Sequence, residues 1–471
     1  MKKMIKKIMP TWLISLYFYS IAFMGAALYF FPSRKMIVIG VTGTKGKTST
    51  INFIWTCLTS GGYKTGIIST ANIRIGQEES LNPYHMTMPG RFTIQKLMAR
   101  MHSIVEDGQE HIDESLKSNP NLTVIKKNAF FLSPNTVQAG DEVIYADKIV
   151  IATGAKSLIL PIPGLDKVPY ITSDDVLELT KLPKSIIIVG GGYIAMELAT
   201  FFNGLGTEVI ILERMPRALS ILDEDVSNFV TECYKEEKIK INTNVNIIGL
   251  RQEKGMILAE TNDVRDPNSK KITYKAEKLL VSVGRTPNTD KLKVEAAGIA
   301  LDQRKNIVVN EFLQTANPNV YAMGDCNGKA PFAHGAKRHS KAVLDNALTN
   351  GKTTITSIMP YAVFTDPPIA GVGLSENQAK DKKIDYGILK ANFSRAGRAT
   401  IIGDTRGFVK VLFDKKDNKI IGATIVGPNA DDIIHEFVAL MNSSGTIDTL
   451  KEMVHIHPTL SEVMEALKTV S

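Results

Sequence analysis

Cysteine is scarce in this chain of 471 residues, which contains only Cys57, Cys233 and Cys326. The three lie far apart, so the sequence has neither a C-x-x-C pair nor a spacing typical of metal ligands. This usage fits a reducing compartment, the cytoplasm. We predict that each cysteine is a small buried residue and not a nucleophile, since nothing nearby in sequence marks an activated thiolate.

Internal repeats and low-complexity tracts are also absent, and no basic stripe interleaves with aromatic residues. The chain is 44% hydrophobic and 22% charged, which is ordinary for globular protein and excludes overall disorder. Its length suits two to four domains. The formal net charge of +8 is spread along the sequence, so we interpret it as a solvated surface without a nucleic-acid partner.

One long uncharged run lies near the N-terminus. Residues 12–31 contain no charge and are about long enough to cross a bilayer as a helix. The lysines before this run would place the rest of the chain outside, which conflicts with the cytoplasmic nucleotides that the motifs below require. Three interpretations stay open: a membrane span, a helix lying on the membrane, and a helix buried in the protein core.

The clearest unit of the chain is a strand, glycine loop, helix and strand over residues 184–213. The loop Gly190-Gly-Gly192-Tyr-Ile-Ala195 joins a predicted strand over 185–189 to a helix that ends before Gly206, and Glu213 ends the next strand. In this context the loop predicts dinucleotide binding, with the pyrophosphate at the helix N-terminus.

Each residue of this loop has an expected role. Gly190 permits the tight turn, Gly192 lets the backbone approach the pyrophosphate, and Ala195 is small enough for close helix–strand packing. Glu213 is expected to accept hydrogen bonds from ribose hydroxyls and to repel a 2′-phosphate, which favours NAD over NADP. Two arginines that follow within four residues keep NADP open as the alternative.

Periodicity and turn residues predict further elements. We expect helices over 103–118, 338–348 and 430–442 and from His457 onward, a βαβ beginning over 36–69, mostly β structure over 241–283, two strands within 307–322, and strands over 409–413 and 420–426.

Three further motifs carry a family resemblance. They are Ala152-Thr153-Gly154-Ala155, Gly284-Arg-Thr-Pro-Asn288 and Tyr321-Ala-Met-Gly-Asp325. From about residue 103 onward the chain resembles the pyridine nucleotide-disulfide oxidoreductases, particularly the dihydrolipoamide dehydrogenase and mercuric reductase branch. The resemblance implies an FAD site that includes Thr153, Gly154 and Asp325, in which Asp325 bonds a ribityl hydroxyl. A turn or N-cap role for Asp325 is the alternative.

The sequence His455-Ile-His457-Pro-Thr-Leu-Ser-Glu462 is similar to the catalytic segment of the same family. The resemblance implies that His457 acts as a general acid–base toward a dithiol and that Glu462 accepts the other imidazole N–H. It also implies a C2 homodimer through about residues 355–471. We predict structural roles for the other histidines considered, His334, His435 and His455.

Two parts of that family's electron relay are missing. Neither its first FAD loop, G-x-G-x-x-G, nor its redox cysteine pair, C-x4-C, occurs upstream of Lys148. Cys233 falls within the predicted NAD domain, and Cys326 follows Asp325 and is expected near the ribityl chain. We therefore expect an incomplete FAD site and weak or absent dithiol–disulfide turnover.

A second glycine loop, Gly43-Thr-Lys-Gly46-Lys47-Thr48, lies close to the N-terminus. Gly43, Gly46 and Lys47 would contact nucleotide phosphates, and the Thr48 hydroxyl would bind Mg²⁺. The loop departs from general P-loop spacing, which places a glycine where Val41 stands.

This loop resembles the ATP-binding loop of the Mur ligases, ATP-dependent amide-forming enzymes of peptidoglycan synthesis. Thr87-Met-Pro-Gly-Arg91 is also similar to that family, so the resemblance covers about residues 35–101. ATP and Mg²⁺ are candidate ligands, although the family's later Mg²⁺ ligands and its closing domain are not recognisable.

Together these features predict an α/β fold: Rossmann-like FAD- and NAD-linked reductase domains plus an α+β C-terminal dimerisation domain, preceded by a hydrophobic helix and a partial P-loop α/β unit. A gene fusion, a truncated reading or an assembly join near residues 101–103 would each produce this order, and a Mur-like unit filling the vacant place in the sheet is a fourth account. The predicted parts are a basic N-terminus with the hydrophobic helix (1–34), the Mur ligase-like unit (35–101), the FAD-domain remnant (102–165), the NAD domain (166–284), the second FAD part (285–350) and the dimerisation domain (351–471).

The predicted function is an NAD-linked flavoprotein oxidoreductase by descent. A membrane-associated ATP-dependent ligase fragment and a non-catalytic dimeric NAD-binding module, anchored through residues 12–31, are the alternatives.

Overall fold

The computed structural model describes residues 66–68, 72–75, 78–81, 93–349, 351–355 and 358–470. The chain divides into two compact units, residues 1–91 and 92–471. The hydrophobic run over 12–31, the ATP loop with Gly43, Gly46, Lys47 and Thr48, and Cys57 lie outside the described residues. No helix within the described ranges is long and apolar enough to cross a membrane.

In the first unit, the described strands form an antiparallel sheet in the order β1-β2-β3. Of the βαβ beginning predicted over 36–69, only β1 lies within the described residues, and it pairs antiparallel with β2. The bounds are β1 (Gly66–Ile68), β2 (Asn72–Ile75) and β3 (Glu78–Leu81).

A 26-residue helix, α4 (Thr93–Ser118), opens the second unit. It confirms the helix predicted over 103–118 but begins earlier. The predicted junction near residues 101–103 therefore lies inside one continuous helix, and the change in composition does not coincide with the end of an element.

The next part of the chain contains short strands. A meander of β4 (Ala129–Ser133), β5 (Thr136–Ala139) and β6 (Glu142–Tyr145) leads to β7 (Ile149–Ile151). Strand β7 pairs in parallel with β18 (Val320–Ala322), and β8 (Ala155–Ser157) pairs antiparallel with β17 (Arg285–Pro287). Helix α8 (Ala333–Leu348), which confirms the helix predicted over 338–348, shares a hydrophobic core with β7 and β18.

The prediction of two strands within 307–322 was wrong for most of that range. Only β18 is a strand there, and Ile307 forms a single bridge with Leu301. Asn310 and Asn317 explain the difference, because their side-chain oxygens accept backbone N–H groups two to four residues onward. Such side-chain turns compete with a sheet ladder.

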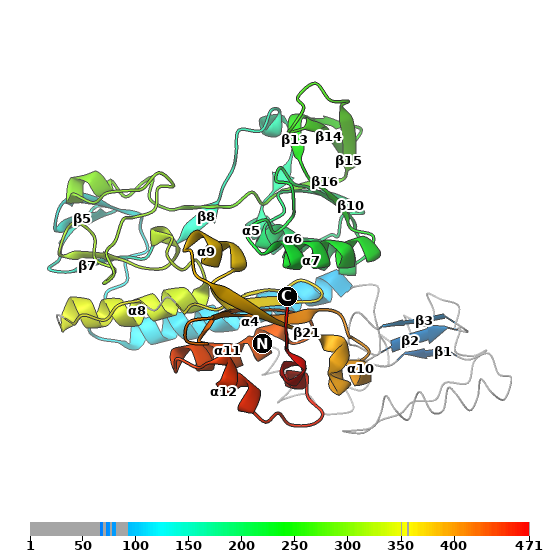
Figure 1. The fold of residues 1–471 in the computed structure, drawn as a ribbon. Helices are drawn as coiled ribbons and strands as arrows, with labels where there is room; N and C mark the ends of the chain where they lie inside the picture. The colour runs from blue at the N-terminus through cyan, green and yellow to red at the C-terminus, as the bar shows by residue number, and fades with distance from the viewer. Residues whose placement is uncertain are drawn as a thin grey trace, which may run out of the picture. The chain divides into compact units, whose positions relative to one another are not determined.

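The central part of the second unit is a five-stranded parallel sheet in the order β12-β11-β10-β16-β9. All five residues of β10 are buried, as expected of a parallel strand covered on both faces. Helices α6 and α7 pack against this sheet (Figure 1). The bounds are β9 (Tyr170–Ile171), β10 (Ser185–Val189), β11 (Glu208–Leu212), β12 (Lys240–Asn242), β16 (Lys278–Val281), α5 (Ser173–Val176), α6 (Tyr193–Gly204) and α7 (Glu224–Glu236), with an antiparallel sheet of β13 (Val245–Glu253), β14 (Met256–Asp263) and β15 (Ile272–Ala276).

The C-terminal part is a six-stranded sheet in the order β19-β20-β23-β22-β21-β24, against which α11 packs (Figure 1). The strands predicted over 409–413 and 420–426 and the helix over 430–442 are confirmed. The bounds are β19 (Tyr361–Val363), β20 (Ile369–Gly373), α9 (Glu376–Asp381), β21 (Tyr386–Asn392), α10 (Gly397–Ile402), β22 (Phe408–Asp414), β23 (Ile420–Val426), α11 (Ala430–Asn442), α12 (Ile447–Glu452) and β24 (Lys468–Thr469).

The helix predicted from His457 onward was wrong. The chain instead forms a short 3₁₀ helix, η6 (Ser461–Ala466), which begins four residues later. His457 precedes Pro458, and the residue before a proline disfavours helical backbone angles.

Candidate functional site

The loop between β10 and α6 has the geometry that a dinucleotide requires. Gly190 has φ +103°, and a Cβ there would stand 2.6 Å from the carbonyl oxygen of Ser282, so only glycine fits. Gly192 is the N-cap of α6, with no side-chain cap and no heavy atom within 4 Å of a Cβ position. The first amides of α6 are therefore approachable by a pyrophosphate. Ala195 is fully buried against the sheet.

Glu213 lies beside this loop at the end of β11. Its carboxylate accepts the backbone N–H of Gly191 and, at 2.6 Å, that of Met215. A carboxylate offers about four lone-pair directions, so acceptor capacity remains for ribose hydroxyls. The structure thus brings the predicted NAD residues to one place. Of the two nearby arginines, Arg217 already pairs with Glu224 at 3.2 Å.

Two further residues of α6 lie beside this site and were not predicted from the sequence. Glu197 accepts the backbone N–H of Phe364 at 2.8 Å, and burial raises the pKa of its carboxyl. Tyr193 stacks on Tyr361 with ring centroids 5.9 Å apart, and burial raises its pKa to about 12. Perturbed titratable groups beside a binding loop are candidate functional groups. The sequence feature that could have identified Glu197 is a carboxylate within the otherwise apolar run 194–199.

The predicted FAD residues meet at the carboxyl ends of two adjacent parallel strands. Thr153 and Gly154 follow β7, and Asp325 follows β18. The amide of Asn288 bridges them to the 284–288 link: its side chain donates to the Thr153 carbonyl at 3.0 Å and its backbone to that of Gly154 at 2.9 Å.

These residues fit part of an FAD site. Gly154 has φ +65° and no heavy atom within 4 Å of a Cβ position, so its backbone is open to a ligand. His339, which was not predicted, is fully buried with Nδ1 accepting the Gly324 N–H at 3.2 Å. Its Nε2 has no partner among the described residues. Those residues contain no second glycine loop for the flavin's ADP moiety.

Both described cysteines are buried, as predicted. Burial raises the pKa of the Cys233 thiol to about 11 and also raises that of Cys326. The Cys326 thiol donates to the Met323 carbonyl at 3.2 Å. Neither thiol has the electropositive, accessible setting of a redox nucleophile.

The structure forms the contact predicted between His457 and Glu462. Nδ1 of His457 lies 2.7 Å from Oε1 of Glu462, and the other carboxylate oxygen accepts the Thr459 N–H at 2.7 Å. The hydrogen bond from His457 lowers the pKa of Glu462. The His457 side chain is 79% exposed, which leaves the second nitrogen accessible.

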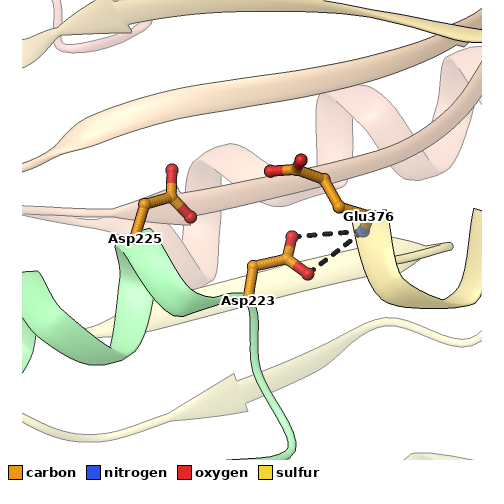
Figure 2. Close-up of side chains that lie close together, drawn as sticks. All are labelled: Asp223, Asp225 and Glu376. Atoms are coloured by element: carbon orange, nitrogen blue, oxygen red, sulfur yellow. Dashed lines mark hydrogen bonds between the residues drawn. The ribbon is translucent and has the colours of Figure 1, made fainter. Parts of the chain in front are cut away.

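Three carboxylates, those of Asp223, Asp225 and Glu376, lie close together between the central and C-terminal parts of the second unit (Figure 2). The Lys410 ammonium lies 2.8, 2.7 and 2.8 Å from them, and its side chain is 1% exposed. Burial alone would lower the pKa of Lys410, but the three hydrogen bonds outweigh this effect and raise it. The centre of the cluster is therefore occupied by a lysine and does not offer a metal site.

Comparison with known proteins gives concordant matches. A family model for pyridine nucleotide-disulphide oxidoreductases matches residues 56–340, and the model for that family's dimerisation domain matches residues 359–467. The chain is 34% identical over 369 residues to dihydrolipoyl dehydrogenase of Geobacillus stearothermophilus, covering 77% of each chain. It is 30% identical over 400 residues to mercuric reductase of Staphylococcus aureus, covering 84% of this chain and 72% of the other.

A solved structure agrees. The chain is similar to the HOCl-induced flavoprotein disulfide reductase RclA of Escherichia coli with a TM-score of 0.73 and 28% identity, covering 79% of this chain and 85% of the other. The first family match begins at residue 56, upstream of the predicted junction near 101–103. These comparisons do not support the Mur ligase-like interpretation of residues 35–101 or the ATP and Mg²⁺ ligands assigned to it.

Proposed function

Because the chain belongs to the pyridine nucleotide-disulphide oxidoreductase family, whose members depend on FAD and NAD(P), we propose that it is an NAD-linked flavoprotein oxidoreductase. The observation that supports this proposal best is the loop geometry: Gly190, Gly192 and Glu213 combine an open helix N-terminus with a carboxylate at the end of the adjacent strand. That arrangement suits a pyrophosphate and an unphosphorylated ribose.

The other site residues have matching roles. Thr153 and Gly154 would contact FAD, and Asp325 would bond a ribityl hydroxyl; the flavin ring supplies a hydride acceptor when FAD is bound. His457 would hold or release a proton at Nε2, while Glu462 fixes Nδ1 as the donor. The sequence contains no C-x4-C pair, and the two described thiols are buried. We therefore propose that dithiol–disulfide turnover by this chain is weak or absent.

NADH titration of the purified protein tests the first part of this proposal. We expect saturable binding, weaker binding of NADPH, and loss of both in Gly192→Arg, because the new side chain occupies the path of the pyrophosphate. Gly108→Arg is the matched control, since Gly108 is exposed on α4 with no heavy atom within 4 Å of a Cβ position. Absence of NADH binding in the parent protein would refute NAD linkage.

FAD retention is tested separately by flavin absorbance after purification. We expect a yield well below one flavin per chain, because the described part of the site lacks a pyrophosphate loop for FAD. A near-stoichiometric yield would show that the chain completes the site in another way.

A further inference from the structure

The segment that contains His457 is attached to α11 through a carboxylate outside the family motif, that of Glu436. One oxygen of Glu436 lies 3.3 Å from Nε2 of His455, and the other accepts the Ser461 hydroxyl at 2.6 Å. A single carboxylate therefore joins the two ends of the segment 455–461 to one helix.

A second carboxylate joins the inner residues of the same segment. Glu462 faces Nδ1 of His457 and accepts the Thr459 N–H. Glu436 thus contacts residues 455 and 461 at the two ends of the segment, and Glu462 contacts residues 457 and 459 within it. Glu436 belongs to α11, whereas Glu462 belongs to the short helix η6 that follows the segment.

Helix α11 holds Glu436 in a fixed position. Ile433, Ile434 and Phe437, which surround Glu436 in sequence, are all buried in the C-terminal core. Residues fixed by packing hold their partners more precisely than loop residues do.

His455 and His457 differ sharply although they are two positions apart. The His455 side chain is 6% exposed, and Oε1 of Glu465 also lies 3.4 Å from its Nδ1, an ion-pair distance without hydrogen-bond geometry. His457 is exposed, and Glu462 is its hydrogen-bond partner. The orientation of His457 therefore depends on where Glu462 stands, and Glu462 adjoins Ser461, which Glu436 anchors.

We propose that Glu436, acting through His455 and Ser461, is the positioning residue of this segment, and that it determines which imidazole nitrogen of His457 carries the proton. A carboxylate partner at one ring nitrogen fixes the tautomer and so the chemistry of the other. The acid–base use of that nitrogen rests on the proposed function, but the geometric dependence does not.

The test is the ¹⁵N spectrum of the histidine rings in the full chain, recorded where His457 is neutral. In the parent protein we expect a single tautomer with the proton on Nδ1. Glu436→Ala should give a mixture of tautomers for His457, because Ser461, the residue before Glu462, loses its hydrogen bond to α11. Glu436→Gln keeps two polar atoms in place and should restore most of the single-tautomer signal. Glu452→Ala, which removes an exposed carboxylate on α12, is the control.

An unchanged His457 spectrum in a folded Glu436→Ala protein would overturn the proposal. If that variant does not fold, Ser461→Ala removes one of the two contacts of Glu436 with a minimal change in volume. An unchanged His457 ring in Ser461→Ala would then overturn it equally. The measurement needs neither cofactor nor turnover, so a tautomer change in a protein that fails to bind NADH would reject the proposed function alone.

Discussion

At the residue scale, Gly190 and Gly192 respond differently to an added methyl group although they share one loop. Gly190→Ala forces a side chain to φ +103° and against the Ser282 carbonyl, and we expect a loss of about 1–3 kcal/mol in unfolding free energy. Gly192→Ala meets no protein atom, so we expect unchanged stability but NADH binding weaker by about tenfold, roughly 1.4 kcal/mol.

Urea unfolding and NADH titration of both variants separate the two effects. Equal stability of Gly190→Ala and the parent would contradict the described turn, and full NADH affinity in Gly192→Ala would contradict the pyrophosphate path.

The pH dependence of Glu462 is a second prediction at this scale. Its pKa is lowered chiefly by the hydrogen bond from His457, so its stabilising effect is present above the unfolded pKa and is lost as the pH falls through the folded one. In His457→Gln we expect the carboxyl pKa to rise toward the ordinary value of 4.5. A carboxyl ¹³C titration measures this change. His334→Gln, whose ring contacts the Pro360 carbonyl, should leave the titration unaltered.

The same residues show what sequence can and cannot reveal about a site. His457 and Glu462 lie five positions apart within one motif, and their contact was predictable. Glu436 lies 19 positions from His455 and Lys410 lies 185 from Asp225, and no local spacing marks either pair. Such partners are brought together only by the packing of elements that are distant in sequence.

At the element scale, the successes and failures have physical causes. Strands 185–189 and 420–426 were predicted with the observed bounds because each is a short apolar run ended by turn residues. The strand prediction failed for most of the range 307–322 because asparagine side chains form turns within an apolar pattern. The helix prediction from His457 onward failed because of Pro458.

Lys410 gives the prediction that belongs to this scale, because it joins the start of α7 to strand β22 and helix α9. Removing one member of a buried ion cluster leaves uncompensated charges. We therefore expect Lys410→Met to lower the unfolding free energy by about 3–5 kcal/mol, measured by guanidinium unfolding.

Lys419→Met is the matched control for this substitution. Lys419 pairs with Asp417 on the surface, where such a pair contributes about 0–1 kcal/mol. A loss for Lys410→Met no larger than that of the control would show that the cluster adds little to the attachment of these elements.

At the scale of the whole molecule, composition proved a poor guide to boundaries. The acidic, polar stretch that begins near residue 103 suggested a junction, yet α4 runs from Thr93 to Ser118 and the division between compact units falls at residues 91–92. A helix tolerates a change from basic to acidic residues along its length, since helix propensity differs little among Lys, Arg, Glu and Gln. A change in charge composition along the sequence therefore indicates a change of surface better than it indicates the end of an element or of a domain.

The final prediction concerns assembly. The dimerisation-domain match supports a homodimer through the C-terminal part. There, Val454 is 94% and Ile456 is 78% exposed, on either side of His455, whose side chain is 6% exposed. Exposed large apolar residues in such a domain indicate a surface that a partner subunit covers. We expect Ile456→Asp to raise the dimer dissociation constant by about 100-fold, roughly 3 kcal/mol, because a carboxylate would be desolvated there.

Analytical ultracentrifugation over a range of concentrations measures this shift, with Ile221→Asp as the control. Ile221 is similarly exposed, at 73%, but lies just before α7 in the central part of the second unit. NADH binding should survive in both variants, since the glycine loop is formed within one chain. If Ile221→Asp dissociated the dimer and Ile456→Asp did not, the interface would have to involve the central part of the second unit.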